Sequence, residues 1–181
     1  MKSTGFAAVG SANARVLILG TLPSVKSLEA GEYYAHPRKS FWWIMGELVG
    51  ALPELPYEER LRKLKESGIA LWDVCKAAER AGSSDAEIRM DSIEANDFRR
   101  FFATHPSIEL ICFNGQPAAK LFRAKALPML TGTRPIPQRI LVSTSPANAR
   151  LTREEKLSLW RNVVCLEGRI VSAKVRLKGT G

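Results

Sequence analysis

Three short apolar runs, each ending in small or polar residues, constrain the fold of this chain most. They are RVLILG (15–20), IELICFNG (108–115) and RILVSTS (139–145). A continuous apolar run of this length is typical of a strand that is buried on both faces, as in a parallel sheet. The sequence therefore predicts a parallel sheet that contains these three strands.

Helical patterns lie between the apolar runs. Apolar residues recur at helical spacing from Phe41 to Val49 and again from Phe98 to Phe102. Ser40 is an N-cap candidate for the first of these helices, Pro117 suits the first turn of a short helix, and Thr152 with Glu155 forms a capping box. The segment IALWDVC (69–75) is either a fourth strand or a buried connector.

Alternating strands and helices indicate an α/β fold, in which the loops beyond the carboxyl ends of the strands build the binding site. This rule selects three segments: 21–40, 114–117 and 143–150. A fourth loop, residues 81–85, follows the IALWDVC segment.

Composition and charge limit the classes of molecule that this chain can bind. The 181 residues predict one domain, and the net charge of +9 favours a polyanionic partner, with nucleic acid ahead of acidic membrane. No apolar run is long enough to cross a bilayer. Three widely spaced cysteines form no metal-binding motif and cannot hold an iron–sulfur cluster through four cysteines, so we expect reduced thiols in a cytoplasmic protein.

The first loop contains the richest chemistry. It places Tyr33, Tyr34, His36, Arg38 and Lys39 close together, just before the predicted helix that starts at residue 41. Aromatic groups interleaved with basic groups can stack a nucleobase and hold its phosphates. The alternative is that the aromatic residues of this segment are core residues; we favour that interpretation for Phe41 and expect the two tyrosines to form a pocket wall.

The other two loops offer hydrogen-bonding groups. Asn114 ends the second apolar run, and its carboxamide can pair with a base edge that presents a carbonyl beside a ring N–H, as uracil and hypoxanthine do. An asparagine here is also an ordinary turn former. The third loop, STSPANAR (143–150), suits phosphate oxygens through its small polar residues and its arginine, and is alternatively a plain capping loop. Its candidate DNA contacts are Ser143, Ser145, Pro146, Asn148 and Arg150.

Four segments together, GTLPSVKSLEAGEYYAHPRKSFW, LWDVC, FNG and STSPANAR, resemble the uracil-DNA glycosylase superfamily, closest to its hypoxanthine-DNA (deoxyinosine) glycosylase branch. The resemblance covers about Arg15 to Trp160. It implies a three-layer α/β/α sandwich around a short parallel sheet, a flipped-out base, and hydrolysis of the N-glycosidic bond without metal or cofactor. It also implies a DNA substrate, double- or single-stranded, with a deaminated base.

The resemblance also implies roles for particular residues. Asn114 would hold the base edge with Phe113 beside it, while Tyr33 or Tyr34 would limit the size of the base. The floor of the pocket would come from the backbone of Gly20, Thr21 and Leu22. The DNA strand would be held by Arg38 and by the residues named above in 143–150.

The sequence departs from the family at two catalytic positions. The hypoxanthine branch has a catalytic asparagine where this chain has Lys39, and related branches have one where this chain has Leu22. Lys39 then has three interpretations. In the first, it is a cation that binds a phosphate, and catalysis depends on His36 or on substrate positioning alone. In the second, it is a catalytic amine whose pKa is lowered by the helix end and Arg38. In the third, its presence indicates a damaged-DNA-binding protein that has lost cleavage.

Further expectations complete the prediction. We expect a glycosylase-like domain over 1–168 and a basic tail over 169–181, patterned as an edge strand whose basic face is either solvated or follows DNA. We also expect a monomer without membrane contact. Asp73 could face the site and orient water, but we expect it instead to pair with Arg80 or a backbone amide and do not count it as catalytic. A metabolic enzyme for small nucleotides is the remaining alternative, although the loop after the first strand has neither GxGxxG nor a Walker sequence.

Overall fold

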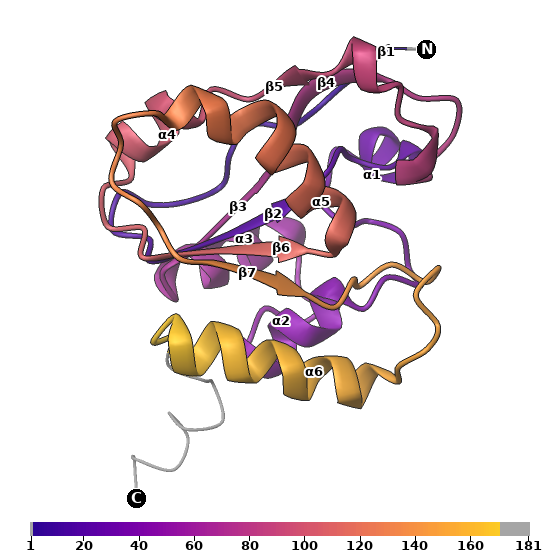
Figure 1. Ribbon diagram of the computed structural model, residues 1–181. Helices are drawn as coiled ribbons and strands as arrows, with labels where there is room; N and C mark the ends of the chain where they lie inside the picture. The colour runs from indigo at the N-terminus through magenta and orange to yellow at the C-terminus, as the bar shows by residue number, and fades with distance from the viewer. Residues whose placement is uncertain (1, 171–181) are drawn as a thin grey trace, which may run out of the picture.

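A four-stranded parallel sheet forms the middle of the protein (Figure 1) in a computed structural model that describes residues 2–170. Its strands lie in the order β3-β2-β6-β7, and they are β2 (Val16–Gly20), β3 (Ile69–Asp73), β6 (Leu110–Asn114) and β7 (Gln138–Leu141). All three neighbouring pairs are parallel. The three predicted strands are confirmed, and IALWDVC supplies the fourth.

Helices cover both faces of this sheet (Figure 1). One layer contains α2 (Phe41–Val49), α3 (Tyr57–Glu66) and α6 (Arg153–Arg161); the other contains α4 (Phe98–Thr104) and α5 (Gln116–Leu121). Side chains of β2 alternate between two cores, because Val16 and Ile18 pack with the first layer while Leu17 and Leu19 pack with the second. The predicted three-layer α/β/α sandwich is confirmed.

The predicted helix starts are also found, with one difference. Thr152 and Glu155 form both hydrogen bonds of a capping box at α6, and Pro117 lies in the first turn of α5. Ser40 occupies the N-cap position of α2, but its side chain makes no capping bond. Its backbone N–H instead donates to Thr144 O at 3.1 Å, which joins the first loop to the third.

A small antiparallel sheet and a short helix accompany the sandwich. The sheet has the order β1-β4-β5, with β1 (Lys2–Thr4), β4 (Cys75–Glu79) and β5 (Glu94–Ala95). Helix α1 (Val25–Ala30) lies inside the first loop. The predicted tail, from residue 171 onward, lies outside the described residues. Among the described residues, no helix combines the length and the hydropathy that a membrane span requires.

Candidate active site

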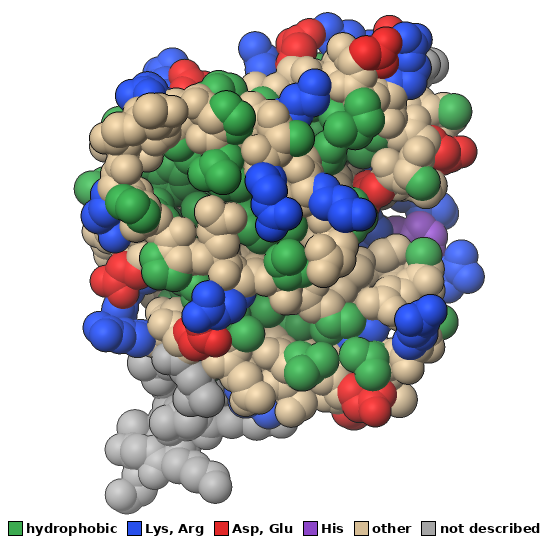
Figure 2. Space-filling model, viewed as in Figure 1, with side chains coloured by type: hydrophobic (Ala, Val, Ile, Leu, Met, Phe, Trp, Pro, Cys, Tyr) green, Lys and Arg blue, Asp and Glu red, His purple; other side chains and the backbone are tan. Residues whose placement is uncertain are grey.

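The three loops selected from the sequence meet in one cleft of about 660 Å³ at the carboxyl edge of the parallel sheet. Figure 2 shows the molecule hollowed on the right, on the side to which the strands of Figure 1 point. The predicted site residues that line the cleft are Gly20, Thr21, Leu22, Tyr33, Tyr34, His36, Lys39, Asn114, Ser143, Ser145, Pro146 and Asn148. A second hollow, of about 600 Å³, is lined mainly by apolar groups and by none of the predicted site residues.

Three predicted site residues do not line the cleft. The ring of Phe113 is 1% exposed and packs against Phe122, with ring centroids 5.2 Å apart, so its side chain belongs to the core and not to a base pocket. The reason is strand alternation, because Phe113 points away from the face that Asn114 points to. Arg38 and Arg150 are exposed outside the cleft lining, where contact with DNA phosphates stays a prediction.

The carboxamide of Asn114 is held in one orientation. Its Oδ1 accepts the backbone N–H of Thr144 at 2.9 Å, and its Nδ2 donates to Thr144 Oγ1 at 2.8 Å. This reciprocal pair joins the end of β6 to the third loop. These two hydrogen bonds use one N–H and one carbonyl lone pair of the Asn114 amide, so a second N–H and a second lone pair are not used by Thr144. Asn114 also lines the cleft.

The two tyrosines of the first loop have different surroundings. Tyr33 is 3% exposed, and its hydroxyl donates to Ala7 O at 3.0 Å, so it is a fixed part of the wall. The ring of Tyr34 stacks on Phe41, with centroids 4.0 Å apart, and its backbone has a φ of 56°. A non-glycine residue in the left-handed region is uncommon, and this conformation turns the chain at the cleft wall. Phe41 is 0% exposed, as expected for a core residue.

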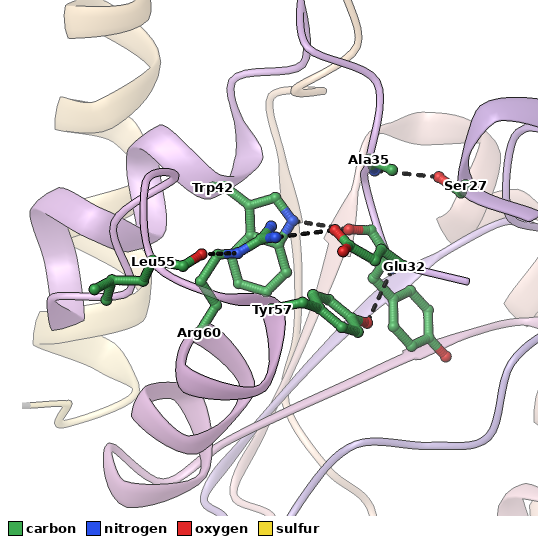
Figure 3. Close-up of polar contacts among 8 residues, drawn as sticks. Ser27, Glu32, Ala35, Trp42, Leu55, Tyr57 and Arg60 are labelled. Atoms are coloured by element: carbon green, nitrogen blue, oxygen red, sulfur yellow. Dashed lines mark hydrogen bonds and ion pairs between the residues drawn. The ribbon is translucent and has the colours of Figure 1, made fainter. Parts of the chain in front are cut away.

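A network outside the cleft holds the first loop in place (Figure 3). The mostly buried guanidinium of Arg60 donates to Glu32 Oε2 at 2.9 Å and to Leu55 O at 3.1 Å, and it lies 4.7 Å from the ring centroid of Trp42. Tyr57 accepts the N–H of Tyr33 at 3.0 Å, so Glu32 and Tyr33 are both anchored to α3.

Replacing Arg60 by alanine should lower the free energy of unfolding by about 2 kcal/mol, because charge-assisted bonds and a cation–π contact are lost together. Urea denaturation measures this loss. Arg62→Ala is the matched control on the same helix: its side chain is exposed and, within residues 2–170, pairs only with Glu59 and Glu66 on that helix, so stability should change far less. Equal losses in the two variants would show that the network does not stabilise the loop.

Lys39 and His36 are the two basic residues of the first loop that line the cleft. Burial lowers the pKa of Lys39, while Asp85 and Asp73 raise it. The pKa of Lys39 is therefore shifted downward, in the predicted direction, but the main cause of the shift is burial and not the helix end. The Lys39 ammonium lies 5.3 Å from the ring centroid of Tyr34.

His36 presents a donor to the cleft. Partial burial, followed by the positive charge of Arg38, lowers the pKa of His36, which favours the neutral ring. Its Nδ1 accepts the N–H of Arg38 at 3.2 Å, which places the proton of the neutral ring on Nε2. In this arrangement His36 donates through Nε2 and does not act as a base there.

Two carboxylates of the cleft were not among the predicted site residues: the sequence analysis set Asp73 aside and did not consider Asp85. Asp73 ends β3 and is 4% exposed, and Asp85 accepts the Thr21 hydroxyl at 2.5 Å from the loop after β4. The signal for Asp73 was its position at the carboxyl end of a strand, the rule that selected the other loops. No cluster of three or more His, Cys, Asp or Glu that could hold a metal is found within residues 2–170.

A parallel sheet between two helical layers, with a polar cleft at its carboxyl edge, defines an α/β enzyme whose site is built from loops. The chain belongs to the uracil DNA glycosylase superfamily, whose sequence profile matches residues 7–165, and it is a DNA glycosylase.

Relatives with assigned names agree with this family. A protein named hypoxanthine DNA glycosylase from Methanosarcina acetivorans is 38% identical over 164 residues, which cover 90% of this chain and 98% of the relative. A second protein of that name, from Methanosarcina barkeri, is 35% identical over 160 residues, 86% of this chain and 94% of the relative. The solution NMR structure of an M. acetivorans protein described as a uracil DNA glycosylase matches with a TM-score of 0.71 and 36% identity, covering 90% of this chain and 99% of that one.

Proposed function

We propose that this protein removes hypoxanthine from DNA by hydrolysing the N-glycosidic bond of deoxyinosine, which leaves an abasic site. The observation that carries this proposal is the Asn114 carboxamide, held by Thr144 so that one donor and one acceptor remain at the cleft. Hypoxanthine presents a matching carbonyl beside a ring N–H. The names of the two relatives point to the same base.

The geometry supports a base-first entry into the cleft. The target nucleotide leaves the duplex at a cost of a few kcal/mol, which is least for a mispaired base. The base then lies between Asn114 and the wall formed by Tyr34, while Ser145 and Asn148 face the DNA strand at the rim. The Nε2–H of His36 is a donor for a phosphate or sugar oxygen at the same rim.

Lys39 takes the place of the missing catalytic amide in this proposal. Cleavage of the bond leaves negative charge on the base and positive charge on the sugar. A half-buried ammonium in the cleft stabilises the negative charge on the departing base, and burial strengthens this interaction because water screens it less. The two other interpretations of Lys39, a phosphate grip and a lost activity, predict different results in the experiment below.

A panel of duplexes, each with one altered base, tests the proposal. We expect release of hypoxanthine from deoxyinosine opposite thymine or cytosine, and slower release of uracil, which offers the same edge but less ring surface for stacking. Free inosine nucleotides should not be cleaved. Tight binding of the deoxyinosine duplex without product would identify a damage-binding protein, and preferred cleavage of free nucleotides would identify a metabolic enzyme.

A further inference from the structure

One carboxyl group in the cleft lacks the partners that buried carboxylates normally have. Asp73 ends β3 next to the last residue of β2, is 4% exposed and lines the cleft. Its Oδ2 is buried and has no hydrogen-bond partner among the described residues. Since buried polar groups are nearly always satisfied, an orphaned oxygen in a cleft marks a place for a ligand.

The expected partner of Asp73 is engaged elsewhere. The sequence predicts a pairing with Arg80, but the Arg80 guanidinium donates to the backbone carbonyls of Leu22 and Pro23, and no ion pair of Asp73 is found within residues 2–170. An ionised carboxylate without such a partner is costly to bury. Burial raises the pKa of Asp73 to about 7, against the opposing effect of Lys39 and Arg80.

The Asp73 carboxyl group packs closely against Gly20, which leaves room for it because glycine has no Cβ. A Cβ on Gly20 would overlap Asp73 Oδ1 and would come within 2.9 Å of the buried Tyr34 hydroxyl. The Asp73 carboxyl group and the Tyr34 hydroxyl therefore converge over the end of β2. The titratable and charged groups whose fields act on Asp73 are Tyr33, Tyr34, Lys39, Cys75, Arg80 and Asp85.

The depth of Asp73 decides which part of the nucleotide it meets. A flipped nucleotide enters base first, so a nearly buried group of the cleft such as Asp73 faces the base, and the sugar and phosphates stay at the rim. We propose that Asp73 is a catalytic acid that transfers its proton to the departing base. This inference rests on the proposed function.

The step balances without a cofactor. The C1′–N9 bond breaks, its electron pair stays on the base, and the Asp73 proton moves to a base nitrogen. Water adds its oxygen to C1′, and its proton restores the carboxyl group. The products are the neutral free base and the abasic sugar.

Single-turnover release of hypoxanthine from Asp73→Asn tests this role, since asparagine keeps the shape and a hydrogen-bond donor but cannot transfer a proton. We expect a rate about 10²-fold below the wild type. The wild-type rate should fall about tenfold per pH unit above about pH 7, and the variant should lose this dependence. Affinity for a duplex with uncleavable 2′-fluoro-deoxyinosine should change less than about threefold. Asp91→Asn, an exposed carboxylate outside the cleft, is the control with wild-type rate.

A stability measurement provides a readout independent of activity. A raised pKa in the folded protein means that wild-type stability is lost as pH rises from about 4 to about 7, so Asp73→Asn should melt higher than the wild type by a margin that grows over this range. If the wild type releases hypoxanthine and Asp73→Asn is equally active, or shows the same pH profile, the acid role alone is overturned. No release by the wild type overturns the proposed function as well.

Discussion

Replacing Lys39 by alanine should lower the single-turnover rate of hypoxanthine release by about 10²- to 10³-fold, the usual loss when one preorganised charge or donor at a developing anion is removed. The ammonium is half-buried in the cleft, near Tyr34 and within the electrostatic influence of Asp73 and Asp85. Its contribution should therefore appear in the chemical step. Quench-flow with excess enzyme measures that step directly.

Two controls separate this role from the other interpretations of Lys39. Lys26→Ala removes a charge from the same loop but outside the cleft lining, and its rate should stay within about threefold of the wild type. A phosphate grip would instead weaken duplex binding, reduce the slope of log K against log salt by about one, and leave the saturated rate intact. An adduct trapped by borohydride would show that the amine attacks the sugar and would contradict a purely electrostatic role.

The fold could best be predicted from the sequence where burial determines the type of residue. Val16 to Leu19 are apolar without interruption because both faces of β2 are covered by helices, so a parallel sheet could be inferred before any contact was known. The rule that loops gather at the carboxyl ends then located the cleft from loops that are far apart in sequence.

The parts that were missed depend on contacts between distant residues. The strand β4 contains small and charged residues, and it forms because Lys2–Thr4 and Glu94–Ala95 lie on either side of it, which no local pattern records. The engagement of Arg80 with Leu22 and Pro23 left Asp73 unpaired, and only the fold brings these residues together. Phe113 was misplaced for a local reason, since strand alternation puts it on the face opposite to Asn114.

Replacing Asn114 by aspartate should reduce kcat/KM for deoxyinosine by about 10³-fold, since sites built to hydrogen-bond a substrate lose at least this much when one polar partner is wrong. The Thr144 N–H can still donate to one carboxylate oxygen, and the Thr144 hydroxyl can turn to donate to the other, so the tie between β6 and the third loop is kept. What changes is the face toward the base, where the donor becomes an acceptor with negative charge and repels the base carbonyl.

Thr144→Val is the matched control for the hydrogen bonds that join Asn114 to Thr144. Valine keeps the backbone N–H that Asn114 Oδ1 accepts but removes the hydroxyl that accepts from Nδ2, so the amide loses part of its anchoring while its donor remains. This variant should lose only about tenfold in kcat/KM and about 1 kcal/mol of unfolding free energy. If Asn114→Asp lost no more activity than Thr144→Val, the carboxamide would serve only to hold the loop, and recognition of the base would have to come from other groups of the cleft.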